Sequence, residues 1–139
     1  MEHLDVIVYR KKELIVGLLM KATAVLASIY GMWRSMTGVM SLTYFTNLSN
    51  IFMDIVLVLF FVIDFILLAS GGEKIYKKNW QYIVKYMATI GITLTFLIYL
   101  TLLAPTSELG FVNAYLHHGA GSLCVHFIAP VLAILDCLW

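Results

Sequence analysis

Polar residues recur at helical spacing where an apolar segment begins, one third of the way along the chain. At roughly 100° per residue they share an arc of about 100° on one helix face. They are Thr43, Thr46, Asn47, Asn50 and Asp54. Lipid cannot hydrogen-bond such a stripe, so it must face other helices or a water-filled cavity. Hydrogen bonding between helices is one interpretation. A functional cavity is the other, and the Asp54 carboxylate favours it.

A second residue with chemical potential, His126, lies four positions before Pro130 near the end of the chain. Pro130 lacks a backbone donor and disturbs the carbonyl of His126, so a kink is expected there. A hydroxyl is a poor nucleophile at neutral pH, but an imidazole with a pKa near 6.5 accepts its proton during attack. Thr46 and His126 are therefore a candidate nucleophile and base. The alternative is a histidine that only packs.

Other chemistries have weaker support. An acid to orient His126 is not obvious, because Asp54 lies about 12 Å deeper than Thr46 by helical rise. The adjacent His117 and His118 lack the spacing of a metal site with His126, so no metal and no cofactor is expected. The two cysteines are 13 residues apart, which is roughly 20 Å on one helix and too far for a disulfide within the chain.

These residues belong to a chain of 139 residues that is 62% hydrophobic and only 12% charged. Soluble domains are about 45–50% apolar and roughly 25% charged. The mean hydropathy of +0.93 excludes a disordered chain and argues against a water-soluble monomer. The net charge of +1 provides no basic surface for nucleic acid.

Four apolar stretches are long enough to position these residues in a membrane. They cover about residues 14–33, 42–69, 83–104 and 122–139, against a requirement of roughly 17–25 residues for a spanning helix. None alternates with period two, which favours helices over strands. We therefore predict an all-α, polytopic transmembrane bundle with four spans, forming a single domain over residues 1–139. The first stretch is interpreted as a retained span rather than a signal peptide.

Basic residues predict the orientation. Three precede the first span, one lies in the first connection, three lie in the second and none lies in the third. Because basic loops stay in the cytoplasm, we predict a cytoplasmic N-terminus in a multi-pass protein of the plasma membrane. The second and fourth spans then both run inward. Thr46 and His126 lie roughly 5–8 Å below the outer edge, and they meet if the two helices are neighbours.

Four further ionisable residues lie within the spans. Lys85 is expected to snorkel toward the headgroups, and Asp64 and Asp136 are expected to face the interface. Lys21 is also within reach of the inner headgroups. An ion pair between Lys21 and Asp64 is the alternative, because both lie in the inner half of the bilayer.

Two segments resemble a known family. Residues 44–50 (YFTNLSN) and 126–136 (HFIAPVLAILD) are similar to the androgen-induced-gene family, and more closely to its bacterial relatives, the "Pr-six-Pr" membrane proteins. The shared patterns are aromatic-Phe-Thr-x-x-Ser-Asn and His-x-x-x-Pro followed by Leu-Asp. The resemblance covers most of the chain from about residue 14. It implies a polytopic helical protein, usually with six spans. Its animal members are threonine-dependent hydrolases of fatty acid esters of hydroxy fatty acids.

By motif, the catalytic Thr and His of those hydrolases correspond to Thr46 and His126. The chain departs from the family in two ways. It ends at Trp139, where the family continues into about two more helices, so a fragment or a short variant is expected. Missing helices or further copies are then possible partners. Pro130 also lies one residue closer to His126 than in the animal pattern, which agrees with the bacterial form.

The sequence thus predicts an intramembrane, threonine-dependent ester hydrolase acting on fatty acyl esters. Asn47, Asn50 and Asp54 are expected to line the substrate cavity, with an Asn donating to the oxyanion. Membrane lipids are the expected partners. The alternatives are a non-catalytic membrane scaffold, in which the stripe only joins helices, and a transport component, in which it forms a polar path.

Overall fold

The computed structural model describes residues 6–7, 11–35, 45–70, 75–76, 79–108 and 110–138. The long apolar runs form α1 (Lys11–Ser35), α2 (Phe45–Ala69), α3 (Asn79–Ile98), α4 (Phe111–Leu123) and α5 (Ala129–Leu138). Two π-helical segments continue these helices: η2 (Tyr99–Leu103) extends α3, and η3 (Cys124–Ile128) joins α4 to α5. The short strands β1 (Val6–Ile7) and β2 (Ile75–Tyr76) complete the described elements.

Four helical stretches are long and apolar enough to cross a membrane. They are Lys11–Arg34, Phe45–Ala69, Trp80–Leu103 and Ala120–Leu138. The all-α bundle with four spans that the sequence predicts is therefore confirmed. The structure lengthens the first span at both ends, shifts the third a few residues toward the N-terminus and begins the fourth at Ala120. Residues 42–44 of the second predicted span lie outside the described residues.

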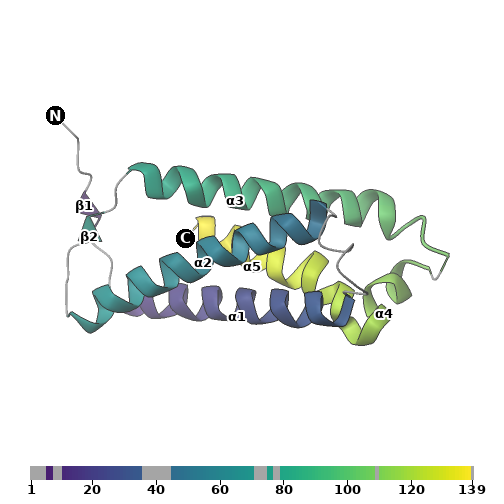
Figure 1. Ribbon diagram of the computed structural model, residues 1–139, viewed down its shortest axis with the longest axis horizontal. Coiled ribbons are helices and arrows are strands. Elements are labelled where there is room, and N and C mark those ends of the chain that lie inside the picture. Colours follow the sequence, from purple (N-terminus) through teal and green to yellow (C-terminus); the bar gives the residue numbers. More distant parts are fainter. Residues whose placement is uncertain are drawn as a thin grey trace.

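The spanning helices form a four-cornered bundle (Figure 1). α1 packs against α2 and against α5 with η3, and α3 also packs against α2 and α5. α2 and α5 consequently occupy diagonal corners. α4 lies at the end of the bundle where α2 begins (Figure 1). At the opposite end, β1 pairs antiparallel with β2, which places the N-terminal segment beside the connection between α2 and α3.

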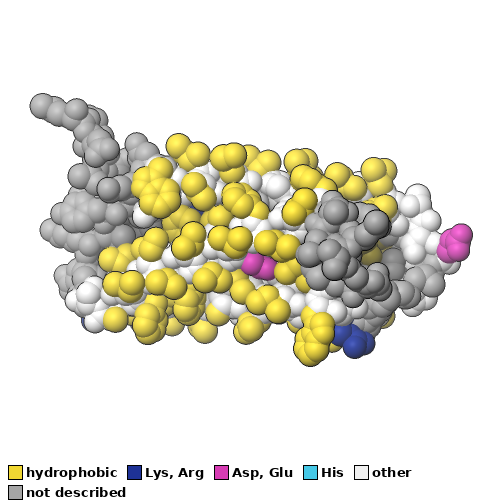
Figure 2. All heavy atoms as spheres, viewed as in Figure 1, with side chains coloured by type: hydrophobic (Ala, Val, Ile, Leu, Met, Phe, Trp, Pro, Cys, Tyr) yellow, Lys and Arg dark blue, Asp and Glu magenta, His cyan; other side chains and the backbone are white. Residues whose placement is uncertain are grey.

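The exterior of the bundle is apolar. Figure 2 shows one face, on which hydrophobic side chains cover the length of the helices. Each spanning helix exposes large apolar side chains, including Leu26, Phe65, Met87 and Leu135. Water would penalise so much exposed apolar surface, whereas a bilayer accommodates it. The fold is that of a membrane protein.

The interior of the bundle has three layers. The central one, here called the apolar layer, consists of Ala24, Met53, Leu57, Ile92, Ala129 and Ala133. On α1, Ala24 separates a serine one turn away, Ser28, from a lysine one turn away on the other side, Lys21. On α2, Asn50 lies one turn before Met53 and Asp64 lies about two turns beyond Leu57, whereas Asp54 lies between Met53 and Leu57. Uncharged polar groups therefore gather on one side of the apolar layer, Asp54 lies level with it, and ion pairs gather on the other side.

Small residues allow α1 to approach the segment from α4 to η3 closely. A Cβ atom added to Gly31 would lie 2.7 Å from the carbonyl oxygen of Gly121 and would also collide with Val125. Glycine is therefore required at this crossing, as in other close contacts between membrane helices. Ala120 has a φ of 62°, in the left-handed region, and it is the first residue of the fourth membrane span.

Candidate functional site

His126 lies on η3, and its ring stacks on that of Tyr99 from η2. The ring centroids are 3.8 Å apart and the planes differ by 6°. Because Pro130 has no N–H to donate to the carbonyl of His126, the helix changes register here, and the Ala129 N–H bonds to the Cys124 carbonyl. The kink expected at Pro130 thus takes the form of a π-helical segment that begins six residues earlier.

Stacking on Tyr99 holds the His126 imidazole in place. His126 is half-buried, and its Nδ1 atom is shielded from solvent and has no hydrogen-bond partner among the described residues. The neighbouring Phe127 packs edge-on against Phe96 of α3, with ring centroids 5.7 Å apart. Two ring contacts therefore fix η3 against η2 and α3.

An apolar pocket lies among α4, η2 and η3, and the last two of these segments carry the ring pair. Its volume is about 260 Å³, and its lining consists of Leu100, Phe111, Val112, Leu116, Leu123 and Phe127. Leu100 follows Tyr99 directly in the chain, and Phe127 follows His126, so the pocket and the ring pair share the same two π-helical segments. A pocket without polar lining at this position suits a hydrocarbon chain.

Thr46 is half-buried in the first turn of α2. Its backbone carbonyl accepts hydrogen bonds from Ser49 Oγ (3.0 Å) and Asn50 Nδ2 (2.8 Å). Within the described part of the chain, no hydrogen bond joins Thr46 to His126. The two residues belong to the same end of the bundle, but α2 and η3 stand at diagonal corners. Their pairing stays a prediction.

Thr43 of the predicted stripe lies outside the described residues, and the three stripe residues after Thr46 face the interior of the bundle. Asn47, Asn50 and Asp54 are buried, with 8%, 0% and 8% of their surface exposed. Ser28 of α1 donates to Asp54 Oδ2 (2.8 Å) and lies 3.5 Å from Asn50 Oδ1. Ser49 Oγ contacts Thr95 Oγ1 of α3 at 2.9 Å. Asn50 and Asp54 of the stripe therefore join α2 to α1, and the neighbouring Ser49 joins α2 to α3. The sequence analysis missed the partners Ser28 and Thr95 and the role of Ser49.

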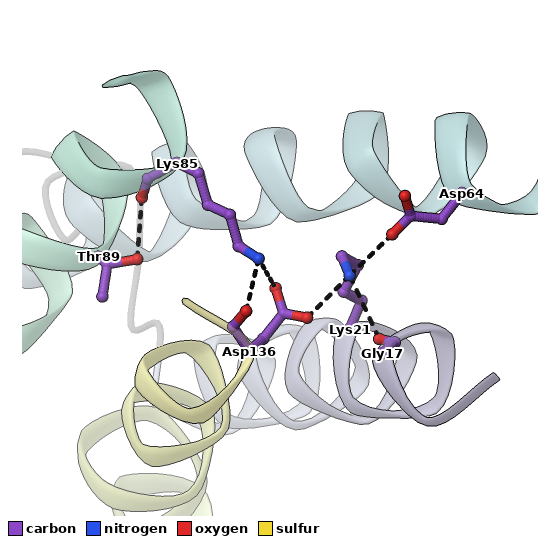
Figure 3. Close-up of polar contacts among 6 residues, drawn as sticks. All are labelled: Gly17, Lys21, Asp64, Lys85, Thr89 and Asp136. Atoms are coloured by element: carbon purple, nitrogen blue, oxygen red, sulfur yellow. Dashed lines mark hydrogen bonds and ion pairs between the residues drawn. The ribbon is translucent and has the colours of Figure 1, made fainter. Parts of the chain in front are cut away.

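On the other side of the apolar layer, four charged residues from four helices form one buried group, here called the ion cluster (Figure 3). The Lys21 ammonium lies 3.0 Å from Asp64 Oδ2 and 2.8 Å from Asp136 Oδ1. Lys85 Nζ lies 2.9 Å from Asp136 Oδ2 and donates its hydrogen bond to the Asp136 backbone carbonyl. With two lysines and two aspartates, the ion cluster is electrically balanced when all four are ionised.

The ion cluster corrects three expectations. Lys85 does not snorkel to the headgroups but turns inward to Asp136, and its side chain is 16% exposed. Asp64 and Asp136 do not face the interface, since their side chains are 8% and 2% exposed. The Lys21–Asp64 pair, which the sequence offered as an alternative, is present. The sequence contained one clue to this cluster: two basic and two acidic residues lie at a similar depth, one on each of the four spans.

The described residues contain no group of three or more His, Cys, Asp or Glu side chains arranged to hold a metal ion. The side chains of His117 and His118 lie outside the described residues. Cys124 and Cys137 are free thiols, in agreement with their separation along the chain.

Comparisons with known proteins found no matching family model, no similar curated protein and no similar solved structure.

Proposed function

We propose that this protein is a membrane-embedded ester hydrolase for fatty acyl esters, with Thr46 as nucleophile and His126 as general base. The observation that carries the proposal is the His126 imidazole. Tyr99 holds its plane, and its Nδ1 atom has no hydrogen-bond partner in the described residues. An apolar pocket of about 260 Å³ is lined by Leu100 and Phe127, the residues that follow Tyr99 and His126 in the chain. A base near a space suited to hydrocarbon favours chemistry at the polar end of an acyl chain.

The proposed reaction begins with an acyl chain that enters the pocket from the bilayer. The Thr46 hydroxyl attacks the ester carbonyl carbon while His126 accepts the hydroxyl proton. The tetrahedral intermediate collapses, the carbon–oxygen bond to the leaving alcohol breaks, and His126 returns the proton to that alcohol. Water then attacks the acyl-threonine by the same route and releases the fatty acid. Substrate binding would draw the first turn of α2 toward η3, since catalytic contacts often tighten only in the complex.

The amides beside Thr46 are suited to stabilising the oxyanion. Asn50 uses Nδ2 to bond the Thr46 carbonyl, which holds the amide within one helical turn of the nucleophile and leaves its second amide hydrogen for substrate. Asn47 is buried beside it. An oxyanion donor contributes roughly 3–4 kcal/mol to such reactions.

We propose in addition that the protein resides in the plasma membrane with its N-terminus in the cytoplasm. The basic residues before α1 and those between α2 and α3 belong to the same side of the membrane, and the pairing of β1 with β2 supports this. Membrane lipids are the proposed source of substrate. Additional helices or further copies of the chain are the proposed partners, as the resemblance to six-span proteins implies.

A non-catalytic scaffold is the second candidate. The observation that favours it is that polar residues of α2 bond to both neighbouring helices: Asn50 and Asp54 to Ser28 of α1, and Ser49 to Thr95 of α3. A transport path has less support. The apolar layer separates the stripe from the ion cluster, so the described side chains provide no continuous polar route.

The test is covalent labelling of the purified protein with an alkyl fluorophosphonate, which traps an activated hydroxyl. We expect labelling of the native protein, loss in Thr46→Ala and strong reduction in His126→Ala. Thr93→Ala is the matched control, because the Thr93 hydroxyl bonds only a carbonyl of its own helix, that of Thr89. Equal labelling of all four proteins would eliminate the hydrolase and favour the scaffold.

A further inference from the structure

A buried group of oxygen atoms lies beside the apolar layer, and its carboxylate and hydroxyl have no role in the proposed hydrolysis. It consists of Ser28 on α1 and of Asn50 and Asp54 on α2, here called the oxygen cluster. Ser28 and Asn50 are 0% exposed and Asp54 is 8% exposed. Each residue directs a side-chain oxygen at its neighbours: Ser28 Oγ lies 2.8 Å from Asp54 Oδ2 and 3.5 Å from Asn50 Oδ1.

The orientation of Asn50 is fixed by its other end. Its Nδ2 atom donates to the Thr46 carbonyl at 2.8 Å. The amide oxygen is therefore the atom that faces Ser28, and the amide nitrogen lies on the other arm of the planar amide, toward Thr46. The hydrogen bond to Thr46 thus orients the Asn50 amide oxygen toward Ser28.

The oxygen cluster has too few donors. It contains two carboxylate oxygens and one amide oxygen as acceptors, but its only donor hydrogen is that of the Ser28 hydroxyl. Ser28 donates this hydrogen to Asp54 Oδ2. Asp54 Oδ1 is buried and has no hydrogen-bond partner in the described residues. A buried polar atom normally has a partner, and an ionised carboxylate away from water needs a compensating positive charge.

No basic side chain among the described residues supplies that charge. The ion cluster uses Lys21 and Lys85 to balance Asp64 and Asp136, and it lies on the other side of the apolar layer from the uncharged members of the oxygen cluster. Asp54 is thus the one buried carboxylate of the described residues that has no cationic partner. A single negative charge surrounded by neutral oxygens matches a monovalent cation, because a divalent ion would leave an excess positive charge in a medium of low dielectric constant.

We propose that the oxygen cluster binds one alkali-metal cation, with Na⁺ as the probe, through Asp54, Asn50 and Ser28. Oxygen donors are the ligands that hard cations prefer. The bound ion would tie α1 to α2 one turn from Thr46. The proposal is independent of hydrolysis, and its test uses no ester.

The test measures the unfolding temperature of the purified full chain in detergent, with choline chloride replaced by sodium, potassium or lithium chloride at constant ionic strength. A ligand that binds only the folded state raises this temperature as its concentration rises. We expect a saturable rise with at least one alkali cation. We expect the rise to vanish in Asp54→Asn and to require higher concentrations in Ser28→Ala. Ser49→Ala is the matched control, since Ser49 is a buried serine bonded to Thr95 instead, and it should keep the response.

Direct binding of radioactive Na⁺ to the native protein provides the second measurement, so the proposal remains testable if Asp54→Asn does not fold. Identical unfolding curves in all salts together with no bound Na⁺ would overturn the proposal and indicate a proton on Asp54. A full cation response in Asp54→Asn would also overturn it, because the ion would then bind elsewhere.

Discussion

The imidazole of His126 lies flat on the ring of Tyr99, with centroids 3.8 Å apart, and each residue belongs to a π-helical segment. Such segments are rare and often occur at functional sites. Here they bring together a candidate base, a ring that fixes its plane and a pocket for hydrocarbon. This relationship, rather than any sequence motif alone, makes His126 the centre of the proposed chemistry.

The ring contact leads to the first prediction. Tyr99→Ala should lower kcat for ester hydrolysis by roughly 10- to 100-fold, because small displacements of a catalytic group have effects of that size. Tyr99→Phe keeps the stacked ring and should retain most of the activity. Steady-state kinetics of both variants with one acyl ester distinguish the cases. Equal losses in the two variants would show that the hydroxyl, not the stacking, is required.

The apolar pocket leads to a prediction about chain length. Leu116→Trp places a large side chain in the lining and should reduce kcat/KM for long-chain esters while leaving short-chain esters nearly unaffected. Each methylene excluded from an apolar site is worth about 0.8 kcal/mol. Leu135→Trp is the control, since Leu135 is an exposed residue of α5 outside that lining. A uniform loss across all chain lengths would mean that the acyl chain binds elsewhere.

The ion cluster leads to a prediction about stability. Asp136→Asn removes the carboxylate that contacts both Lys21 and Lys85, and it should destabilise the fold by roughly 3–5 kcal/mol because two buried ammonium groups lose a partner. Adding Lys85→Met restores the balance of charge around the remaining Lys21–Asp64 pair. The double variant should therefore be more stable than the two separate losses predict.

Unfolding in mixed micelles with increasing denaturing detergent measures these differences. Additive losses in the Asp136→Asn and Lys85→Met variants would contradict the view that the ion cluster acts as one charge-balanced unit. Thr89→Val is a useful reference, because Thr89 lies beside the ion cluster but bonds only the Lys85 carbonyl of its own helix.

The crossing of α1 and η3 leads to a prediction about packing. Gly31→Ala introduces a Cβ atom 2.7 Å from the Gly121 carbonyl oxygen and should cost about 1–3 kcal/mol of stability. Gly91→Ala is the matched control, because the nearest atom to its new Cβ would be 3.8 Å away. The same unfolding assay compares the two variants. A Gly31→Ala protein as stable as Gly91→Ala would show that the helices separate at no cost.

The sequence predicts the helices well because hydrophobic length and period are local properties. The four spans and the inward-facing stripe of Asn47, Asn50 and Asp54 follow from them. Local patterns do not specify which helices are neighbours or how each is rotated. Depth alone suggested that Thr46 and His126 meet, whereas α2 and η3 stand diagonally across the bundle. For the same reason the inward turn of Lys85 toward Asp136 became apparent only from the packing of α3 on α5.

The central claim is that Thr46 and His126 act on one ester, and a double-mutant cycle of hydrolysis rates tests it most directly. When two catalytic residues act as a unit, removing both lowers the reaction rate little more than removing either one. The account predicts that Thr46→Ala, His126→Ala and the double variant hydrolyse a long-chain fatty acyl ester equally slowly, far below the native rate. Independent, multiplicative losses, or a native rate in either single variant, would contradict it.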